Sequence, residues 1–325
     1  PLAALSAPTR GLPTAVRYTA QRRQFGPSGE REVPILAYTT MQRALMPRLA
    51  STYALHFALR ALQARFDTWA RSGEEDPELE VLAAGLKSWA SDHCTDTLVV
   101  AREACGGQGY LAENHFAALK ADTDIFTTFE GANVVLYQLA AKGLLSRYRD
   151  EMGSLDVRRA LRYLGERAET SLIELNPVTT RRTDTDHLLD PAFHRAALEY
   201  REDRLLRSVA MRMRSRLRDG MDSFEAVNEV QDHLVAVARA HVERIMLDHF
   251  HAGREIVGDP EVRAALERTC ALYALSRIEE DRGWYLEAGY LEAAKSRAIR
   301  ALVMDLCADS AAAATALVGG FGIPD

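Results

Sequence analysis

Apolar residues recur along this chain at helical spacing, and no segment shows the sustained alternation of apolar and polar residues that marks a half-buried strand. Leu45, Leu49 and Tyr53 recur every fourth residue and define one face of a long amphipathic helix. We predict this helix over residues 37–69, with a kink at Pro47. The pattern therefore indicates helices rather than a sheet.

Two further long helices are predicted in the first half of the chain. Asp76-Pro77 is a typical start signal, and the helix that follows covers residues 78–105, where a glycine-rich turn ends it. Residues 111–128 are predicted to form a short helical piece and a loop. Another long helix covers residues 132–148.

The N-terminal segment contains breaks in an otherwise alanine-rich run. Pro8, Gly11 and Pro13 fall where a helix would continue. Proline inside a helix removes a hydrogen bond and costs about 3 kcal/mol. The sequence leaves open whether this segment is one helix or an interrupted one.

The fold class predicted for the whole chain is all-α, with two helical bundles in tandem, because long helices joined by short loops form antiparallel bundles. The boundary is placed within residues 149–155, giving domains 1–150 and 151–325. The segment 176–191 is polar and contains two prolines, so it is predicted to be an exposed loop. In the second half we predict helices over 156–174, 191–218, 224–256, 260–280 and 284–318.

Composition excludes several classes of function. The chain has 325 residues, 47% hydrophobic and 26% charged, with a net charge of −6 and interspersed signs, so nothing indicates a nucleic-acid-binding surface. No apolar run approaches the roughly 20 residues that a membrane span requires. We therefore expect neither nucleic acid nor membrane as a partner.

Cysteine and histidine spacing gives no metal site. Cys94, Cys105, Cys270 and Cys307 lack zinc or redox-motif spacing and are predicted to be buried free thiols in a reducing compartment. Four histidines recur within one predicted helix without a supporting carboxylate motif, and we interpret them as packed or solvated side chains. They are His233, His241, His249 and His251.

Two neighbouring motifs carry the candidate chemistry. Gly106 and Gly107 lie in a turn where backbone can approach a ligand closely. About twenty residues later, Glu130 is predicted at the start of a helix, where free N–H groups can stabilise a developing negative charge while a carboxylate removes a proton. A capping glutamate is the alternative interpretation of the same pattern.

The residue sequence of these motifs resembles that of the acyl-CoA dehydrogenase and acyl-CoA oxidase superfamily. The resemblance lies in three stretches, and in looser matches in the second half to the extra helical domain of the oxidases. The three stretches are Arg22-Arg23-Gln24-Phe25-Gly26, Arg102-Glu103-Ala104-Cys105-Gly106-Gly107-Gln108-Gly109-Tyr110 with Asp122-Thr123-Asp124, and Phe129-Glu130-Gly131-Ala132-Asn133. The looser matches are Gln231-Asp232-His233 and Ala240-His241-Val242-Glu243.

The resemblance implies an FAD-dependent enzyme that oxidises fatty acyl-CoA to trans-2-enoyl-CoA and reduces oxygen to hydrogen peroxide. Glu130 would be the base, flanked by Phe129 and Gly131 at the substrate, and burial among Phe126, Phe129 and the acyl chain would raise its pKa. Two alternatives remain, namely a dehydrogenase that passes electrons to a flavoprotein and a non-catalytic helical partner subunit.

The resemblance also implies where the flavin binds. Arg22, Gln24 and Phe25 would contact the cofactor across the interface of a homodimer, and Gly106, Gly107 and Asn133 would complete the contact. Glu103 stands where many dehydrogenases carry a glutamine that contacts the flavin, and Ala132 replaces the usual aspartate or threonine and removes one polar contact.

In the resembled family an N-terminal helical domain and a β-domain precede these motifs, so we expect this chain to be the C-terminal half of a larger protein. Its expected location is the cytoplasm in a bacterium or the peroxisome in a eukaryote.

Overall fold

The computed structural model describes residues 1–154 and 180–323, and within these ranges the chain forms helices and no strand. The all-α prediction is confirmed. An isolated antiparallel bridge between Arg23 and Pro34 is the only β-type pairing in these residues. None of the helices in these ranges is long and apolar enough to cross a membrane.

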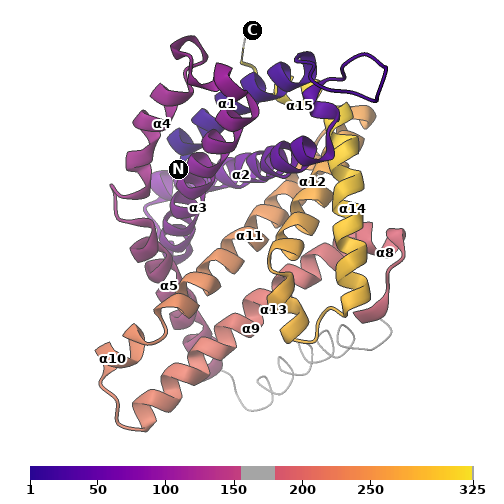
Figure 1. Cartoon of the computed structure of the whole chain (residues 1–325). Coiled ribbons are helices and arrows are strands. Elements are labelled where there is room, and N and C mark those ends of the chain that lie inside the picture. Colours follow the sequence, from indigo (N-terminus) through magenta and orange to yellow (C-terminus); the bar gives the residue numbers. More distant parts are fainter. Residues whose placement is uncertain (155–179, 324–325) are drawn as a thin grey trace.

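The first half of the chain forms five α-helices and short 3-10 turns (Figure 1). The helices predicted over 37–69, 78–105 and 132–148 are present, each within a few residues of the expected start, and the last extends further than expected. The α-helices are α1 (Leu2–Gln21), α2 (Thr39–Ser72), α3 (Pro77–Ala104), α4 (Phe116–Asp124) and α5 (Asn133–Ser154). The 3-10 turns are η1 (Ile35–Ala37), η2 (Gly106–Tyr110), η3 (Ala112–Asn114) and η4 (Ile125–Thr127).

Helix α1 continues through both of its prolines. Pro8, Gly11 and Pro13 are all buried, and α1 packs against α2, α3 and α15. A Cβ on Gly11 would lie 2.9 Å from the side chain of Leu98, so the glycine permits the close approach of the two helices. Tertiary packing of this kind supplies most of a helix's stability and offsets the cost of the prolines.

The second half contains eight helices among its described residues. The helices predicted over 191–218 and 260–280 are confirmed, whereas 224–256 divides into two and 284–318 into three. The prediction for 156–174 lies outside the described residues. The helices are α8 (Thr185–Leu189), α9 (Pro191–Arg218), α10 (Ser223–Asn228), α11 (Gln231–Glu255), α12 (Pro260–Glu280), α13 (Arg282–Glu287), α14 (Ala293–Ala312) and α15 (Ala314–Gly319).

The exposed loop predicted over 176–191 is wrong in its described C-terminal part, where α8 forms. The Asp184 side chain accepts a hydrogen bond from the His187 N–H and caps the helix. Leu188 of α8 is buried in the main hydrophobic cluster, which anchors this short helix to the core.

Aspartate followed by proline begins three of the longest helices. Asp76, Asp190 and Asp259 each accept hydrogen bonds from backbone N–H groups of the first turn, and each is followed by a proline. The aspartate satisfies donors that the helix cannot, and proline has no N–H to leave unsatisfied at that position. Short sequence signals therefore fix where α3, α9 and α12 start.

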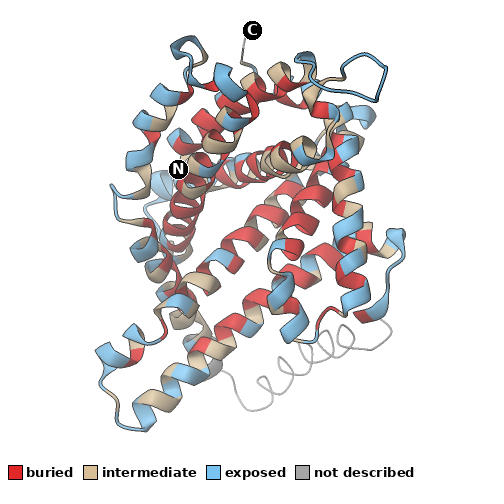
Figure 2. Cartoon of the chain, in the orientation of Figure 1, coloured by how far each residue is buried: buried red, intermediate tan, exposed pale blue. Residues whose placement is uncertain are grey.

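The two halves of the chain share their hydrophobic cores. One buried cluster joins Leu49 of α2 and Leu98 of α3 to Tyr273 of α12, and the other joins Tyr137 of α5 to Val237 of α11. Helix α11 packs against α2, α3 and α5 as well as α9 and α12. The buried residues in Figure 2 accordingly form a band that runs from the first half into the second.

Candidate functional site around Glu130

Glu130 lies in a tight turn between η4 and α5. Its φ is 57° and that of Gly131 is 104°, so two consecutive residues adopt backbone angles that side chains rarely allow. Helix α5 begins only at Asn133, so Glu130 precedes the helix by three residues and does not open it as expected. Within the described chain, neither the Glu130 N–H nor the Gly131 N–H donates a hydrogen bond to a partner.

The surroundings of Glu130 are more open than expected. Glu130 is exposed, and Phe129 is 43% exposed. The Phe129 ring stacks on Phe126 with 5.6 Å between ring centroids, on the same short segment as the glutamate. The apolar enclosure expected around Glu130 is therefore not formed by the described residues alone.

Asn133 is buried, and its side-chain amide is occupied by α3. The amide nitrogen donates to the Ser88 carbonyl at 3.2 Å and to the Asp92 carboxylate at 2.7 Å. The amide oxygen accepts from Ser91 at 3.1 Å and from Lys87 at 3.0 Å. This residue, expected at the cofactor, instead ties the start of α5 to α3.

Lys87 is one of the residues of this site that none of the sequence motifs contains. Its side chain is buried, with 6% exposure for the residue, and its ammonium donates to the Gly131 carbonyl at 2.8 Å as well as to Asn133. Burial lowers the pKa of Lys87, and the Glu130 carboxylate opposes that effect. The buried Lys87 ammonium thus hydrogen-bonds the backbone of the turn that carries Glu130.

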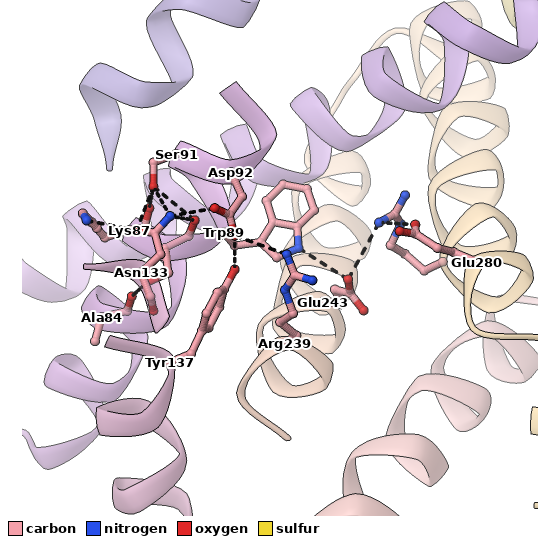
Figure 3. Close-up of polar contacts among 12 residues, drawn as sticks. Ala84, Lys87, Trp89, Ser91, Asp92, Asn133, Tyr137, Arg239, Glu243 and Glu280 are labelled. Atoms are coloured by element: carbon pink, nitrogen blue, oxygen red, sulfur yellow. Dashed lines mark hydrogen bonds and ion pairs between the residues drawn. The ribbon is translucent and has the colours of Figure 1, made fainter. Parts of the chain in front are cut away.

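The network continues from the Glu130 turn into the second half of the chain (Figure 3). The Asp92 carboxylate accepts from the Tyr137 hydroxyl and from Arg239 of α11, both at 3.2 Å. The Arg239 guanidinium also lies over the Tyr137 ring, 5.5 Å from its centroid. Arg239, Asp92 and Asn133 therefore form a chain of contacts from α11 to the start of α5.

The looser motif on α11 forms another link between the halves. The buried Glu243 carboxylate pairs with Arg201 of α9 at 2.7 Å and accepts from Trp89 of α3 at 3.4 Å. Helices α2, α3, α11 and α12 border a polar cleft of about 630 Å³, where Arg277 and Glu280 of α12 pair at 2.7 Å. Charges in this cleft largely neutralise one another.

The predicted flavin segment Arg22–Gly26 forms one arm of an exposed loop after α1, and the other arm contains Val33. The Gln24 N–H donates to Val33, and the Val33 N–H donates back to the Phe25 carbonyl at 2.8 Å. Phe25 has a φ of 59° and is 71% exposed, and a Cβ on Gly26 would lie 2.6 Å from the Arg31 carbonyl oxygen. The loop presents its arginine and aromatic ring to the outside.

The glycine-rich turn after α3 is open where the flavin is expected. Gly106 has a φ of 54°, and a Cβ on Gly106 or Gly107 would meet no atom of this chain. Gly109 differs, because a Cβ there would overlap the Arg102 carbonyl oxygen. Gly106 and Gly107 thus leave room for a ligand or another subunit, and Gly109 closes the turn.

The two predicted flavin segments lie toward the same end of the bundle, away from Glu130. Helices α1 and α3 run in the same direction, since Leu2 borders the same groove as Leu79 and Gly11 meets Leu98. Lys87 of α3 contacts the Glu130 turn, so its position along α3 gives the height of that turn in the bundle. At a rise of 1.5 Å per residue, α1 and α3 both end about 25–30 Å further along the bundle. Figure 1 shows the loop after α1 at the upper right and the start of α5 on the left.

The prediction of buried free thiols is confirmed for the cysteines. All four cysteines are free and buried. Within the described residues no group of histidine, cysteine and acidic side chains is placed to hold a metal ion. His241 instead contacts Glu202 of α9 at 2.8 Å, one more link between α11 and its neighbour.

Comparison with known proteins gives one consistent family. Residues 3–145 match the family described as acyl-CoA oxidase, C-alpha1 domain, and residues 190–325 match the family described as acyl-CoA oxidase. Acyl-coenzyme A oxidase 2, peroxisomal, from Arabidopsis thaliana is 41% identical over 96% of this chain and 45% of its own length. The chain thus spans about half the length of the curated relatives that it matches.

Solved structures share the fold. Acyl-CoA oxidase 1 from Yarrowia lipolytica is similar over 99% of this chain and 48% of its own, with a TM-score of 0.88 and 26% identity. Acyl-CoA oxidase-1 from Caenorhabditis elegans, a structure complexed with FAD and ATP, covers the same shares with a TM-score of 0.84 and 21% identity. At that identity the second likeness concerns the fold alone.

Proposed function

Because this chain belongs to the acyl-CoA oxidase family, we propose that it forms the C-terminal half of an FAD-dependent enzyme that oxidises fatty acyl-CoA to trans-2-enoyl-CoA. The observation that carries the proposal is the Glu130 turn, where an exposed carboxylate stands beside backbone N–H groups that no described residue uses. We place this turn at the reacting carbons of the thioester.

Glu130 would act as the base for the α-proton of the thioester. The proton passes to the carboxylate, and the Glu130 N–H is available to donate to the thioester oxygen as negative charge develops there. When bound, the flavin supplies the acceptor for the hydride that leaves the β-carbon. Phe129 and Gly131 would contact the substrate on either side of the base.

The exposed position of Glu130 fits an enzyme in which substrate and further protein cover the site. An α-proton is weakly acidic, so the base needs water excluded around it when substrate is bound. Phe126 and Phe129 provide one apolar wall, and the acyl chain and the rest of the enzyme would provide the others. Asn133 we assign to holding the turn, because α3 occupies its amide.

The flavin would be held partly by a second copy of the chain. Arg22, Gln24 and Phe25 are presented outward, and an arginine can bind pyrophosphate oxygens through two parallel hydrogen bonds while an aromatic ring packs on the cofactor. Gly106 and Gly107 leave space beside them. These residues lie too far along the bundle to serve the Glu130 of their own chain, which supports a homodimer in which each serves its partner.

Oxygen is the proposed electron acceptor, since the relatives and the family descriptions are oxidases and the second half of the chain matches the oxidase family. Full-length protein should form one hydrogen peroxide per enoyl-CoA when palmitoyl-CoA or octanoyl-CoA is turned over in air. Turnover that starts only on addition of an electron-transfer flavoprotein would instead identify a dehydrogenase. No flavin reduction with any acyl-CoA would identify a non-catalytic helical subunit.

The peroxisomal relative supports a peroxisomal location in a eukaryotic host. The bacterial, cytoplasmic alternative expected from the sequence gains no support from the comparisons.

A further inference from the structure

We propose that Lys87 is a positioning residue for Glu130, and that its buried ammonium holds the turn that carries the base. The inference rests on the proposed function, and it adds a residue that none of the sequence motifs contains. Lys87 acts on the backbone beneath Glu130, through the Gly131 carbonyl and the Asn133 amide.

The turn requires such a restraint. Glu130 and Gly131 both have positive φ, and a glutamate in this region persists only where its surroundings determine it. The preceding backbone is tied to η4, whose Ile125 carbonyl accepts from the N–H groups of Thr128 and Phe129. From Glu130 onward, the contact to Lys87 is the first that fixes the path of the chain.

The contacts of Lys87 join the turn to a rigid support. Its two acceptors lie on either side of Ala132, so one ammonium spans the connection between the Glu130 turn and α5. Asn133 is fixed in turn by Ser91 and Asp92 of α3, at 2.9 and 2.7 Å. Lys87 and Asn133 together leave the turn little freedom to move relative to α3.

Packing alone does not explain a lysine at this position. A methionine of similar length would fill the space without removing a charge from water, and buried charges are retained with difficulty for stability only. The charges that act on Lys87 are the carboxylates of Glu130 and Asp92, one of which belongs to the proposed base. The lysine thus holds the turn and places a positive charge near the base.

A double-mutant cycle tests the inference in the full-length protein with FAD bound. Lys87→Met, Glu130→Gln and the double variant are compared with wild type by anaerobic flavin reduction with palmitoyl-CoA. Misplacement of a base costs up to about a hundredfold in rate, so Lys87→Met alone should slow reduction about ten- to a hundredfold. In the Glu130→Gln background it should cost little more, because the base through which Lys87 acts is already absent.

Three controls separate positioning from general damage. Lys142→Met changes an exposed lysine of α5 and should leave the rate unchanged. Lys87→Arg keeps donors and charge and should recover part of the lost rate. Should Lys87→Met fail to fold, Lys87→Gln enters the same cycle, because its amide can still donate to one of the two acceptors.

Wild-type reduction rates in Lys87→Met, or effects of Lys87→Met and Glu130→Gln that multiply in the double variant, would overturn the positioning role alone. Glu130→Gln at the wild-type rate would overturn the proposed function and this inference with it.

Discussion

Two glycines in the turn after α3 have different physical reasons to be glycine. A Cβ on Gly109 would overlap the Arg102 carbonyl oxygen, whereas a Cβ on Gly107 would meet nothing in this chain. Gly109 therefore shapes the turn itself. Gly107 keeps space free outside it, where we place the cofactor.

This difference predicts opposite results for two alanine variants. Gly109→Ala should lower the free energy of unfolding by about 1–3 kcal/mol, because backbone must shift to relieve the overlap. Gly107→Ala should melt at the wild-type temperature and retain less FAD after gel filtration. Thermal unfolding and the flavin-to-protein absorbance ratio report the two effects. Equal melting temperatures for both variants would show that the turn tolerates a side chain at Gly109.

At the scale of residues, the sequence motifs identified Glu130 as the candidate base but did not identify Lys87, which holds the turn. Glu130 stands within a recognisable run of residues, but Lys87 lies inside a helix, and lysine at such positions is usually solvated. The return of the chain to α3 at Gly131 and Asn133 gives the Lys87 ammonium two acceptors. The same fold-level contact explains why Asn133, expected at the cofactor, has its amide occupied by α3.

Among the elements, close contacts depend on small residues where helices cross. A Cβ on Gly143 of α5 would overlap the side chain of Val81 on α3, and a Cβ on Gly85 of α3 would lie 2.6 Å from Val242 of α11. These contacts place α5, and therefore the Glu130 turn at its start, against α3 and α11.

Gly143→Ala should accordingly push α5 away from α3 and destabilise the protein by about 1–3 kcal/mol. A second substitution, Val81→Ala, removes the atoms that the new methyl group meets and should restore part of the loss. Chemical denaturation of both variants and of Val81→Ala alone completes the comparison. If the two losses simply add, the helices do not approach at these residues as described.

Helix positions could be predicted where local signals are strong. The Asp76-Pro77 pair predicted the start of α3, and apolar spacing predicted the extent of α2 to within three residues. The breaks were missed: α13 ends before Gly289, whose φ is 72°, within a run that we predicted as one helix. The apolar spacing is judged over a window of many residues, so it does not reveal a helix break caused by a single residue with left-handed backbone angles.

At the scale of the whole molecule, the residues of the proposed site lie at two separate places along the helical bundle. The segments proposed to hold the flavin follow the ends of α1 and α3, about 25–30 Å along the bundle from Glu130, and we propose that two subunits bring them together. Spacing along the sequence could not reveal this separation, which follows from the parallel course of α1 and α3.

Mixing two inactive variants of the full-length protein tests the arrangement. In a dimer of Glu130→Gln with Arg22→Ala, one site combines an intact Glu130 with the intact Arg22 of the other subunit. Mixed dimers should regain up to about half of the wild-type activity, because one of two sites is complete. Light scattering checks that the species is a dimer. No recovery on mixing would place Arg22 and Glu130 in the same site of one chain.

Each of the two hydrophobic clusters contains residues from both halves of the chain, so the halves share their cores. Family matches separate residues 3–145 from 190–325, yet both cores contain residues from each half. The boundary within residues 149–155 stays a prediction, and α11 packs against helices on both sides of it.

The central claim is that Glu130 removes the α-proton. Its most direct test is stopped-flow reduction of the bound flavin by palmitoyl-CoA without oxygen, in wild-type and Glu130→Gln full-length protein. Glutamine keeps the shape of the side chain but cannot accept the proton, so bleaching of the flavin should slow by at least about two orders of magnitude, with FAD content unchanged. Bleaching at a near wild-type rate in Glu130→Gln would contradict the account.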